Sequence, residues 1–199
     1  MNTEAGMVRF ESGMDGRRLQ EHLLAPEFQD DTLHKSIFTK KETLQRILGR
    51  GGHIALALLE NQFIVGFAAL DFPEPDDRWA GMGGQTVMEL KAVEVVPRLR
   101  KSGIARQLLS ILTSGSRLDR KIVYLVSYSW LWDNRQTGLT VPGYRHMLIR
   151  LFAGFGFEEA ATNEPNICLR DENIFMVRMG NHVSQYHREA FKWLRFGLK

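Results

Sequence analysis

The sequence holds a single cysteine, Cys168, among its 199 residues, and this scarcity excludes an internal disulfide bond. Because a lone thiol is typical of a reducing compartment, we expect a cytoplasmic protein. Long hydrophobic runs are also missing. The longest, FIVGFAAL at 63–70, is much shorter than the roughly 20 residues that span a bilayer, and it is typical of a buried strand. The first residues show no charged flank followed by an apolar stretch, so we expect neither a signal peptide nor a membrane partner.

Metal-ligand spacing is absent as well, since the six histidines fit no zinc pattern and no cysteine pair accompanies them. We therefore expect no metal. A strong excess of one charge is lacking too, because 26 basic and 23 acidic residues give a formal net charge of +3. This excess is too small to predict a nucleic-acid partner. The aromatic and basic stretch at 183–196 is instead expected to form a helix that packs on its own domain or on a second copy in a homodimer.

Hydrophobic periodicity, in contrast, is plentiful. Three consecutive strands in the middle of the chain favour antiparallel hairpins, and strand–helix–strand from 87 to 132 predicts a parallel crossover. The sequence therefore predicts an α/β (α+β) fold with a mixed sheet, in one domain over 1–199 with a helical tail at 183–199. Strands are expected at 7–12, 53–60, 63–72, 87–96, 121–132 and 173–180, and helices at 15–24, 39–48, 103–115, 143–157 and 183–196. Thr39 and Glu42 form a capping-box pattern for the second helix.

The stretch RLRKSGIA at 98–105 lies between a predicted strand and a predicted helix. Gly103 adopts a positive φ without steric cost and lets a ligand approach the backbone closely. The helix that follows presents unpaired amides and the positive end of its dipole. These features favour a phosphate or pyrophosphate site, although the stretch is neither a P-loop nor a dinucleotide fingerprint. The cationic side chains around the helix start are Arg98, Arg100, Lys101 and Arg106.

The same stretch resembles the pyrophosphate loop of the GNAT acetyltransferases, Arg/Gln-x-x-Gly-x-Gly/Ala, with Arg100, Gly103 and Ala105 at its defined positions. The order of strands and helices matches that fold over nearly the whole chain. A narrower resemblance, to acetoin-utilisation-type acetyltransferases, rests on four segments. They are ELKAVEVVPRLRKSGIARQLL, SWLWDNRQTGLTVPGYRHM, ATNEPN and PEPDDRW.

This resemblance implies an acetyl-CoA-dependent N-acetyltransferase with a splayed central sheet. Acetyl-CoA is implied to lie between the strands at 87–96 and 121–132, with the Val93 amide directed at the thioester oxygen. The narrower branch implies a protein lysine as acceptor, as in acetyl-CoA synthetase. A small-molecule amine acetyltransferase or a non-catalytic acyl-CoA sensor is the alternative. The residues implied in cofactor binding are Val93, Val95, Arg100, Lys101, Ser102, Gly103, Ile104, Ala105 and Arg106.

Attack by an amine requires its neutral form, and a lysine with a pKa of about 10.4 is protonated near neutral pH. A positioned carboxylate is therefore expected. Glu89 lies eleven residues before Arg100, the spacing at which histone-type members of the family place their catalytic glutamate. It also shares a strand face with Val93. We predict Glu89 as the general base, with Glu94 or an ordered water as the alternatives.

The sequence departs from the family at the position that would supply a proton to the leaving thiolate. Phe152 stands where many members carry a tyrosine that donates a proton, and phenylalanine has none to donate. We predict that no general acid is essential, with Tyr128 or Tyr144 as the alternative donor.

An acceptor wall is expected at the end of the strand predicted at 121–132. Trp130, Trp132 and Asp133 provide two aromatic rings and a carboxylate, which suit the stem and ammonium of a lysine. Asp77, in the loop predicted at 73–86, is a further candidate for recognition of a basic acceptor. Ordinary packing of the aromatic rings and a solvated loop are the alternatives.

Overall fold

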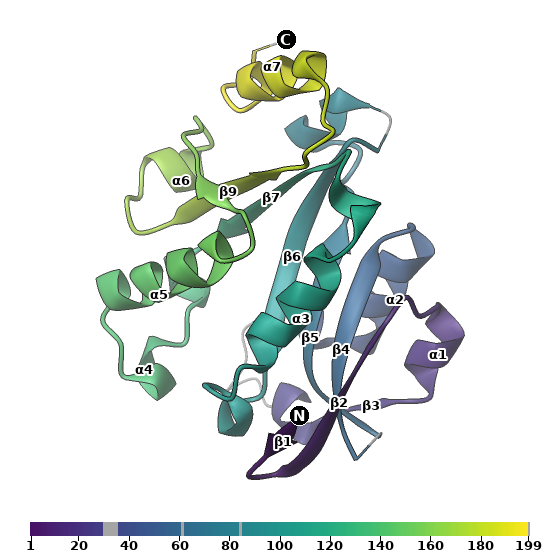
Figure 1. Cartoon of the computed structure of the whole chain (residues 1–199). Coiled ribbons are helices and arrows are strands. Elements are labelled where there is room, and N and C mark those ends of the chain that lie inside the picture. The colour runs from purple at the N-terminus through teal and green to yellow at the C-terminus, as the bar shows by residue number, and fades with distance from the viewer. Residues whose placement is uncertain (30–35, 61, 84, 199) are drawn as a thin grey trace. The chain divides into compact units, whose positions relative to one another are not determined.

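The computed structural model describes residues 1–29, 36–60, 62–83 and 85–198 (Figure 1). The chain divides into two compact units. Unit 1 comprises Met1–Asp71 and Lys91–Thr113, and unit 2 comprises Phe72–Leu90 and Ser114–Lys199. Strand β6 (Val87–Val95) contributes residues to both. The single domain expected from the sequence stays a prediction.

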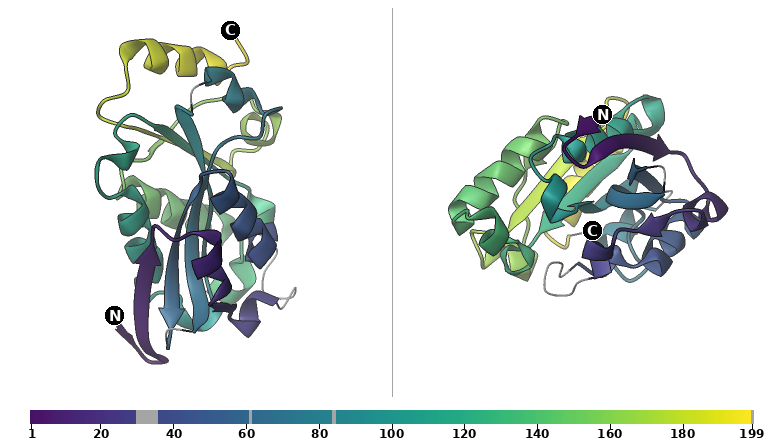
Figure 2. Two further views of the ribbon diagram at one scale, coloured as in Figure 1. Left: turned by 90° about the vertical axis from the view of Figure 1, so that its right-hand side faces the viewer. Right: turned by 90° about the horizontal axis from the view of Figure 1, so that it is seen from below.

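Unit 1 is built on a sheet in the order β1-β2-β4-β5-β6. Neighbours are antiparallel from β1 to β5, which confirms the predicted hairpin between the runs at 53–60 and 63–72. Figure 2 shows α3 on one face of this sheet and α1 and α2 on the other. The elements are β1 (Asn2–Thr3), β2 (Gly6–Ser12), α1 (Gly16–Gln20), β3 (Leu23–Leu24), η1 (Pro26–Gln29), η2 (Ile37–Thr39), α2 (Lys41–Gly49), β4 (His53–Leu59), β5 (Phe63–Asp71), η4 (Pro97–Leu99) and α3 (Ile104–Thr113).

Unit 2 continues from β6 in the order β6-β7-β9-β8. The β6–β7 pair is parallel, as the predicted crossover requires, and the β7–β9 and β8–β9 pairs are antiparallel. The mixed α/β class predicted from the sequence is therefore confirmed. The elements are η3 (Arg78–Met82), η5 (Ser116–Leu118), β7 (Ile122–Ser127), η6 (Ser129–Leu131), α4 (Asn134–Thr137), α5 (Val141–Ala153), β8 (Glu158–Glu159), α6 (Pro165–Cys168), β9 (Ile174–Met179) and α7 (Gln185–Leu194).

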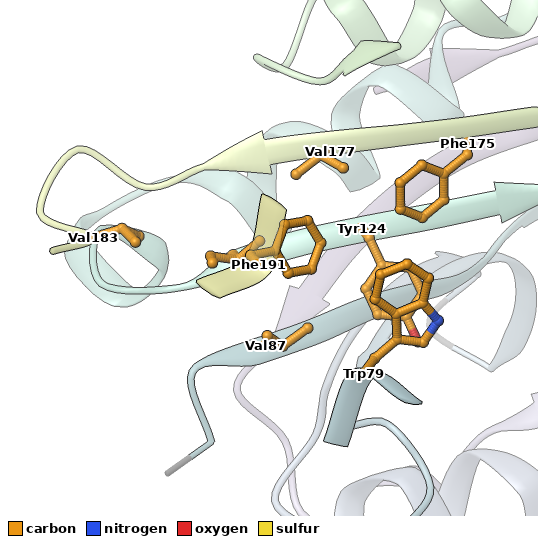
Figure 3. Close-up of a cluster of buried hydrophobic side chains, with 8 residues drawn as sticks. Trp79, Val87, Tyr124, Phe175, Val177, Val183 and Phe191 are labelled. Carbon is orange, nitrogen blue, oxygen red and sulfur yellow. The ribbon is translucent and has the colours of Figure 1, made fainter. Parts of the chain in front are cut away.

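An aromatic core holds η3, β7, β9 and α7 of unit 2 together (Figure 3). The Trp79 ring stacks on Phe175 with the centroids 5.2 Å apart and the planes at 19°. Tyr124 and Phe191 lie 4.8 Å and 5.6 Å from the Trp79 centroid. All four residues are buried. Because each large ring buries some 150–250 Å² of surface, this core dominates the packing on this side of the unit.

The last turn of α7 is fastened by hydrogen bonds to the carbonyl of Arg195. That oxygen accepts from Thr162 Oγ1 at 2.7 Å, from Arg78 Nη1 at 3.2 Å and from the Asn163 amide at 3.3 Å. Arg78 Nη1 also donates to Asn163 Oδ1 at 2.5 Å. The residue immediately before Trp79 is thus tied to the C-terminal end of the helix that supplies Phe191.

Three predicted elements are wrong in extent or detail. The strand expected at 121–132 ends at Ser127, because the Ser129 amide turns to the buried Asn173 side chain and donates to Oδ1 at 2.7 Å. The helix expected at 15–24 ends at Gln20, since Leu23–Leu24 pairs with β5 as a short parallel strand. The capping box fails because Lys40 is the N-cap of α2, whereas the Thr39 hydroxyl donates to the Ser36 carbonyl.

No helix in the described ranges is long and apolar enough to cross a membrane.

Candidate active site

The loop between β6 and α3 in unit 1 has an unusual backbone. Lys101 has a φ of +66° and Gly103 a φ of +91°, so two left-handed residues flank Ser102. For Lys101 this conformation costs about 1–2 kcal/mol, whereas glycine adopts it freely. Ser102 Oγ donates to the Leu99 carbonyl at 2.6 Å and helps to hold the turn. A loop of this form presents successive backbone amides on one concave side, as anion-binding loops do.

Most backbone N–H groups of this loop donate no hydrogen bond to the described residues. The Arg100 amide closes η4 on the Pro97 carbonyl, and the Gln107 amide is the first in α3 to bond back, to Gly103. Within the described ranges, the amides from Lys101 to Arg106 have no acceptor. They coincide with the positive end of the α3 dipole.

The side chains of the loop take a supporting part. Arg100 Nε donates to the Val95 carbonyl at 3.3 Å, and Arg98 forms an ion pair with Glu27 at 2.6 Å. Lys101, Ser102, Gly103 and Arg106 are exposed, whereas Ile104 is buried and holds the first turn of α3 against the sheet. A Cβ built on Gly103 meets nothing within 4 Å, so the space beside this glycine is open. The structure thus places unpaired backbone amides and exposed cations together at the predicted anion site.

Glu94, the alternative candidate for the general base, lies in unit 1 and interacts with Ser36 and Arg100. Burial raises the pKa of its carboxyl, while a hydrogen bond with Ser36 and the charge of Arg100 act in the opposite direction. Val95 is buried and Val93 is half-buried on the same strand. A half-buried carboxyl that is hydrogen-bonded to Ser36 and lies near the charge of Arg100 has the surroundings of a structural group.

Glu89, in the part of β6 that belongs to unit 2, meets a partner that the sequence analysis missed. In the parallel β6–β7 pair Glu89 stands opposite Tyr124, and the Tyr124 hydroxyl donates to Glu89 Oε2 at 2.8 Å. Burial raises the pKa of the Tyr124 phenol strongly, and the nearby carboxylates of Glu89 and Asp77 raise it further. Tyr124 therefore stays protonated and acts as a permanent donor.

Further carboxylates surround a second phenol in unit 2. Burial raises the pKa of Tyr128, and the charges of Glu164, Glu89 and Asp77 add to this effect. Three carboxylates thus act on one half-buried phenol. Asp77 was predicted from the sequence, but Glu164 was not. The ATNEPN segment was the available signal, although only the folded chain brings it near β7.

The predicted acceptor wall divides into three separate arrangements. Trp130 is 44% exposed and stacks on Tyr128 with 4.7 Å between the centroids. The Arg170 guanidinium lies 5.5 Å from the Trp130 ring centre.

Trp132, in contrast, stacks on Tyr144 at 5.2 Å, and its Nε1 donates to Ser127 Oγ. Asp133 is the N-cap of α4, where its side chain accepts from the Gln136 amide. The strand end that was to align Trp130 and Trp132 does not exist, because both residues follow β7.

Phe152 lies in α5 and is buried, with its ring 6.1 Å from that of Phe157. It is a core residue here and offers no proton. Among the described residues no group of three or more His, Cys, Asp or Glu side chains is arranged to hold a metal ion. Cys168 is exposed and forms no disulfide.

No protein-family model matches the chain. Two curated proteins named acetoin utilization protein AcuA are similar to it over most of its length. The protein from Bacillus licheniformis is 31% identical over 198 residues, which cover 98% of this chain and 92% of the relative. The protein from Bacillus subtilis is 29% identical over 184 residues, which cover 92% and 88%.

The fold is also similar to those of solved structures. The crystal structure of an acetoin utilization protein from Exiguobacterium sibiricum has a TM-score of 0.88 at 26% identity and covers 99% of this chain and 92% of its own. A GNAT superfamily phosphinothricin acetyltransferase from Sinorhizobium meliloti, solved in complex with AcCoA, has a TM-score of 0.57 at 15% identity, covering 89% and 90%. The latter likeness is one of fold.

Proposed function

Because the chain belongs to the acetoin utilization protein AcuA family and has the fold of the GNAT acetyltransferases, we propose that it moves the acetyl group of acetyl-CoA to a lysine ε-amino group of a protein. The family membership confirms the narrower resemblance that the sequence carries, and the GNAT fold supports the enzyme class, an N-acetyltransferase. The acceptor and the residue roles are the proposal. A cytoplasmic location is part of it, supported by the single cysteine.

The observation that carries the proposal is the row of unpaired amides from Lys101 to Arg106. Two left-handed residues and the α3 N-terminus direct these donors into open space, which fits a pyrophosphate. The phosphinothricin acetyltransferase of the same fold was solved with AcCoA, which supports acetyl-CoA as the donor here. We assign the loop amides to its pyrophosphate and the β6 backbone at Val93 and Val95 to its pantetheine arm. Arg100 and Arg106 add positive charge nearby.

Glu89 is the proposed general base. The lysine ammonium gives its proton to the Glu89 carboxylate, and the neutral amine attacks the thioester carbonyl in a ternary complex. The amide of Val93 stabilises the oxyanion of the tetrahedral intermediate, whose nitrogen gives its second proton to solvent as the intermediate collapses and expels the thiolate of CoA. Because a thiolate with a pKa near 8.5 leaves readily, no acid is required, and the buried Phe152 is consistent with that.

A cationic acceptor is favoured by the charges in unit 2. Asp77, Glu89 and Glu164 all act on Tyr128, so this region attracts a positive group. The Tyr128–Trp130 stack adds an aromatic surface of the kind that packs on a lysine stem. Trp132 and Asp133 stay predicted members of the acceptor site. Acetyl-CoA synthetase is the protein acceptor that we propose to test first, because the sequence resemblance points to it.

The test is acetylation of purified acetyl-CoA synthetase with labelled acetyl-CoA, followed by mass spectrometry. Separate reactions contain a lysine peptide or a polyamine, and the Glu89→Gln variant is the control. We expect a modified lysine on the synthetase and a loss of about 100-fold in rate for the variant. Acetylation of the polyamine alone contradicts the protein acceptor. Binding of acetyl-CoA without turnover on any amine contradicts the enzymatic proposal and favours an acyl-CoA sensor.

A further inference from the structure

We propose that Tyr124 is a positioning residue for acetyl transfer: its hydroxyl fixes the orientation of the Glu89 carboxylate, and an aromatic clamp built by η3, β9 and α7 fixes Tyr124. This inference rests on the proposed role of Glu89 as the base. Tyr124 acts through Glu89 and touches neither acceptor nor cofactor in the mechanism above.

The register of the sheet places the two residues together. Glu89 and Tyr124 are partners in the parallel β6–β7 pair, and the O–H···O distance of 2.8 Å between oxygens is that of a good hydrogen bond. Donation to a carboxylate gives a strong hydrogen bond and selects one side-chain orientation. A base that must meet an ammonium in one geometry gains from this orientation.

The donor is neutral, and its surroundings are acidic. Asp77 and Glu164 bring negative charge to the region of Tyr124 and Tyr128. A neutral O–H holds the Glu89 carboxylate without placing a cation where the acceptor's ammonium binds. The Tyr124 phenol is suited to this, because burial and the adjacent carboxylates keep it protonated.

The clamp explains why the phenol is fixed. Figure 3 shows the Trp79 ring against Tyr124, with Phe175 and Phe191 beside them. The centroid distances from Tyr124 are 4.8 Å to Trp79 and 6.1 Å to Phe175. Tyr124 is 1% exposed, whereas the stacked Tyr128 is half-buried. Since the ring is held before substrate arrives, its orientation costs nothing at the moment of reaction.

The test compares Tyr124→Phe, Glu89→Gln and the double variant with the wild type. Tyr186→Phe is the matched control, because it removes the same hydroxyl from a ring that is 77% exposed on α7. The assay is steady-state acetylation of a lysine peptide from pH 6 to 9, with thermal unfolding of each protein. Tyr124→Phe keeps the ring and its packing but loses one hydrogen bond to a charged oxygen, so its unfolding temperature should fall by about 3–12 °C while the protein stays folded at the assay temperature.

For Tyr124→Phe we expect kcat to fall by about tenfold with KM for acetyl-CoA unchanged, because a misoriented carboxylate takes up the ammonium proton less readily. In the Glu89→Gln background the same substitution should have no further effect on kcat, because Tyr124 acts through Glu89. Tyr186→Phe should match the wild type.

Two results overturn the inference alone. One is a Tyr124→Phe profile identical to that of the wild type while Glu89→Gln is impaired. The other is a fall in kcat of the same size in both backgrounds, which would show that Tyr124 acts by another route. Full activity of Glu89→Gln across the pH range is a different result. It would show that Glu89 is not the general base, and it would refute that part of the proposed function.

Discussion

Gly103→Ala tests the loop that carries the proposed function. Gly103 has a φ of +91°, where an alanine is strained by about 1–2 kcal/mol, and the added Cβ meets nothing in the protein itself. Gly13, in the same unit, has a φ of +70° and equally open surroundings. Gly13→Ala is therefore a control that carries the same backbone strain away from the loop. Both variants should lose about 1–2 kcal/mol of unfolding free energy, or about 2–8 °C in Tm.

Only the loop variant should lose affinity for the cofactor. Its methyl group occupies the open space over the amides, and the loss of one hydrogen bond to a charged oxygen costs about 1.5–3 kcal/mol. The Kd for CoA should then rise by about 10- to 150-fold. Calorimetric titration with CoA and a thermal melt of both variants provide the measurements. An unchanged Kd for Gly103→Ala, or an equal rise for Gly13→Ala, would refute the assignment of the loop.

Three more predictions concern other parts of the chain. Trp79→Leu should cost about 3 kcal/mol of unfolding free energy and lower kcat, whereas Trp79→Phe should keep most of both, as thermal melts and steady-state kinetics will measure. The pKa of Glu94 in the folded protein lies above its ordinary 4.5, so the folded state holds that proton more tightly, and the free energy of unfolding falls as pH rises from 4.5 to the folded-state pKa. In urea titrations at pH 4–7, Glu94→Gln should flatten this fall. A pH dependence of the unfolding free energy equal to that of the wild type contradicts the assignment. Tyr144→Phe should leave the rate of lysine acetylation within about twofold, and abolished transfer with an intact fold would establish an essential acid.

The sequence predicts the local features of this protein well. The loop at 98–105 is a short stretch whose glycine, cations and following helix act on one another, so its form follows from neighbouring residues. The parallel crossover follows from strand, helix and strand in succession. In unit 1 the positive φ of Gly103 and the start of α3 at Ile104 both agree with that local reasoning.

The features that the sequence did not reveal depend on long-range contacts. Tyr124 is 35 residues from Glu89, and only the register of the β6–β7 pair makes them partners. The end of β7 is decided by Asn173, whose side chain takes the Ser129 amide 44 residues earlier. Periodicity contains no information on either pairing, so the strand was predicted too long and Tyr124 was overlooked.

The fastening of α7 bears on the order in which the chain folds during synthesis. Phe191 completes the aromatic core, and the Arg195 carbonyl ties the end of the helix to Arg78 and Thr162. The ribosome makes α7 after Trp79, Tyr124 and Phe175, so a nascent chain lacks the contacts that complete the clamp on Tyr124 until α7 has been made. A chain truncated before Phe191 would keep the loop at 98–105 but lose the ring beside Trp79. Premature termination should therefore yield a protein that binds CoA and acetylates poorly.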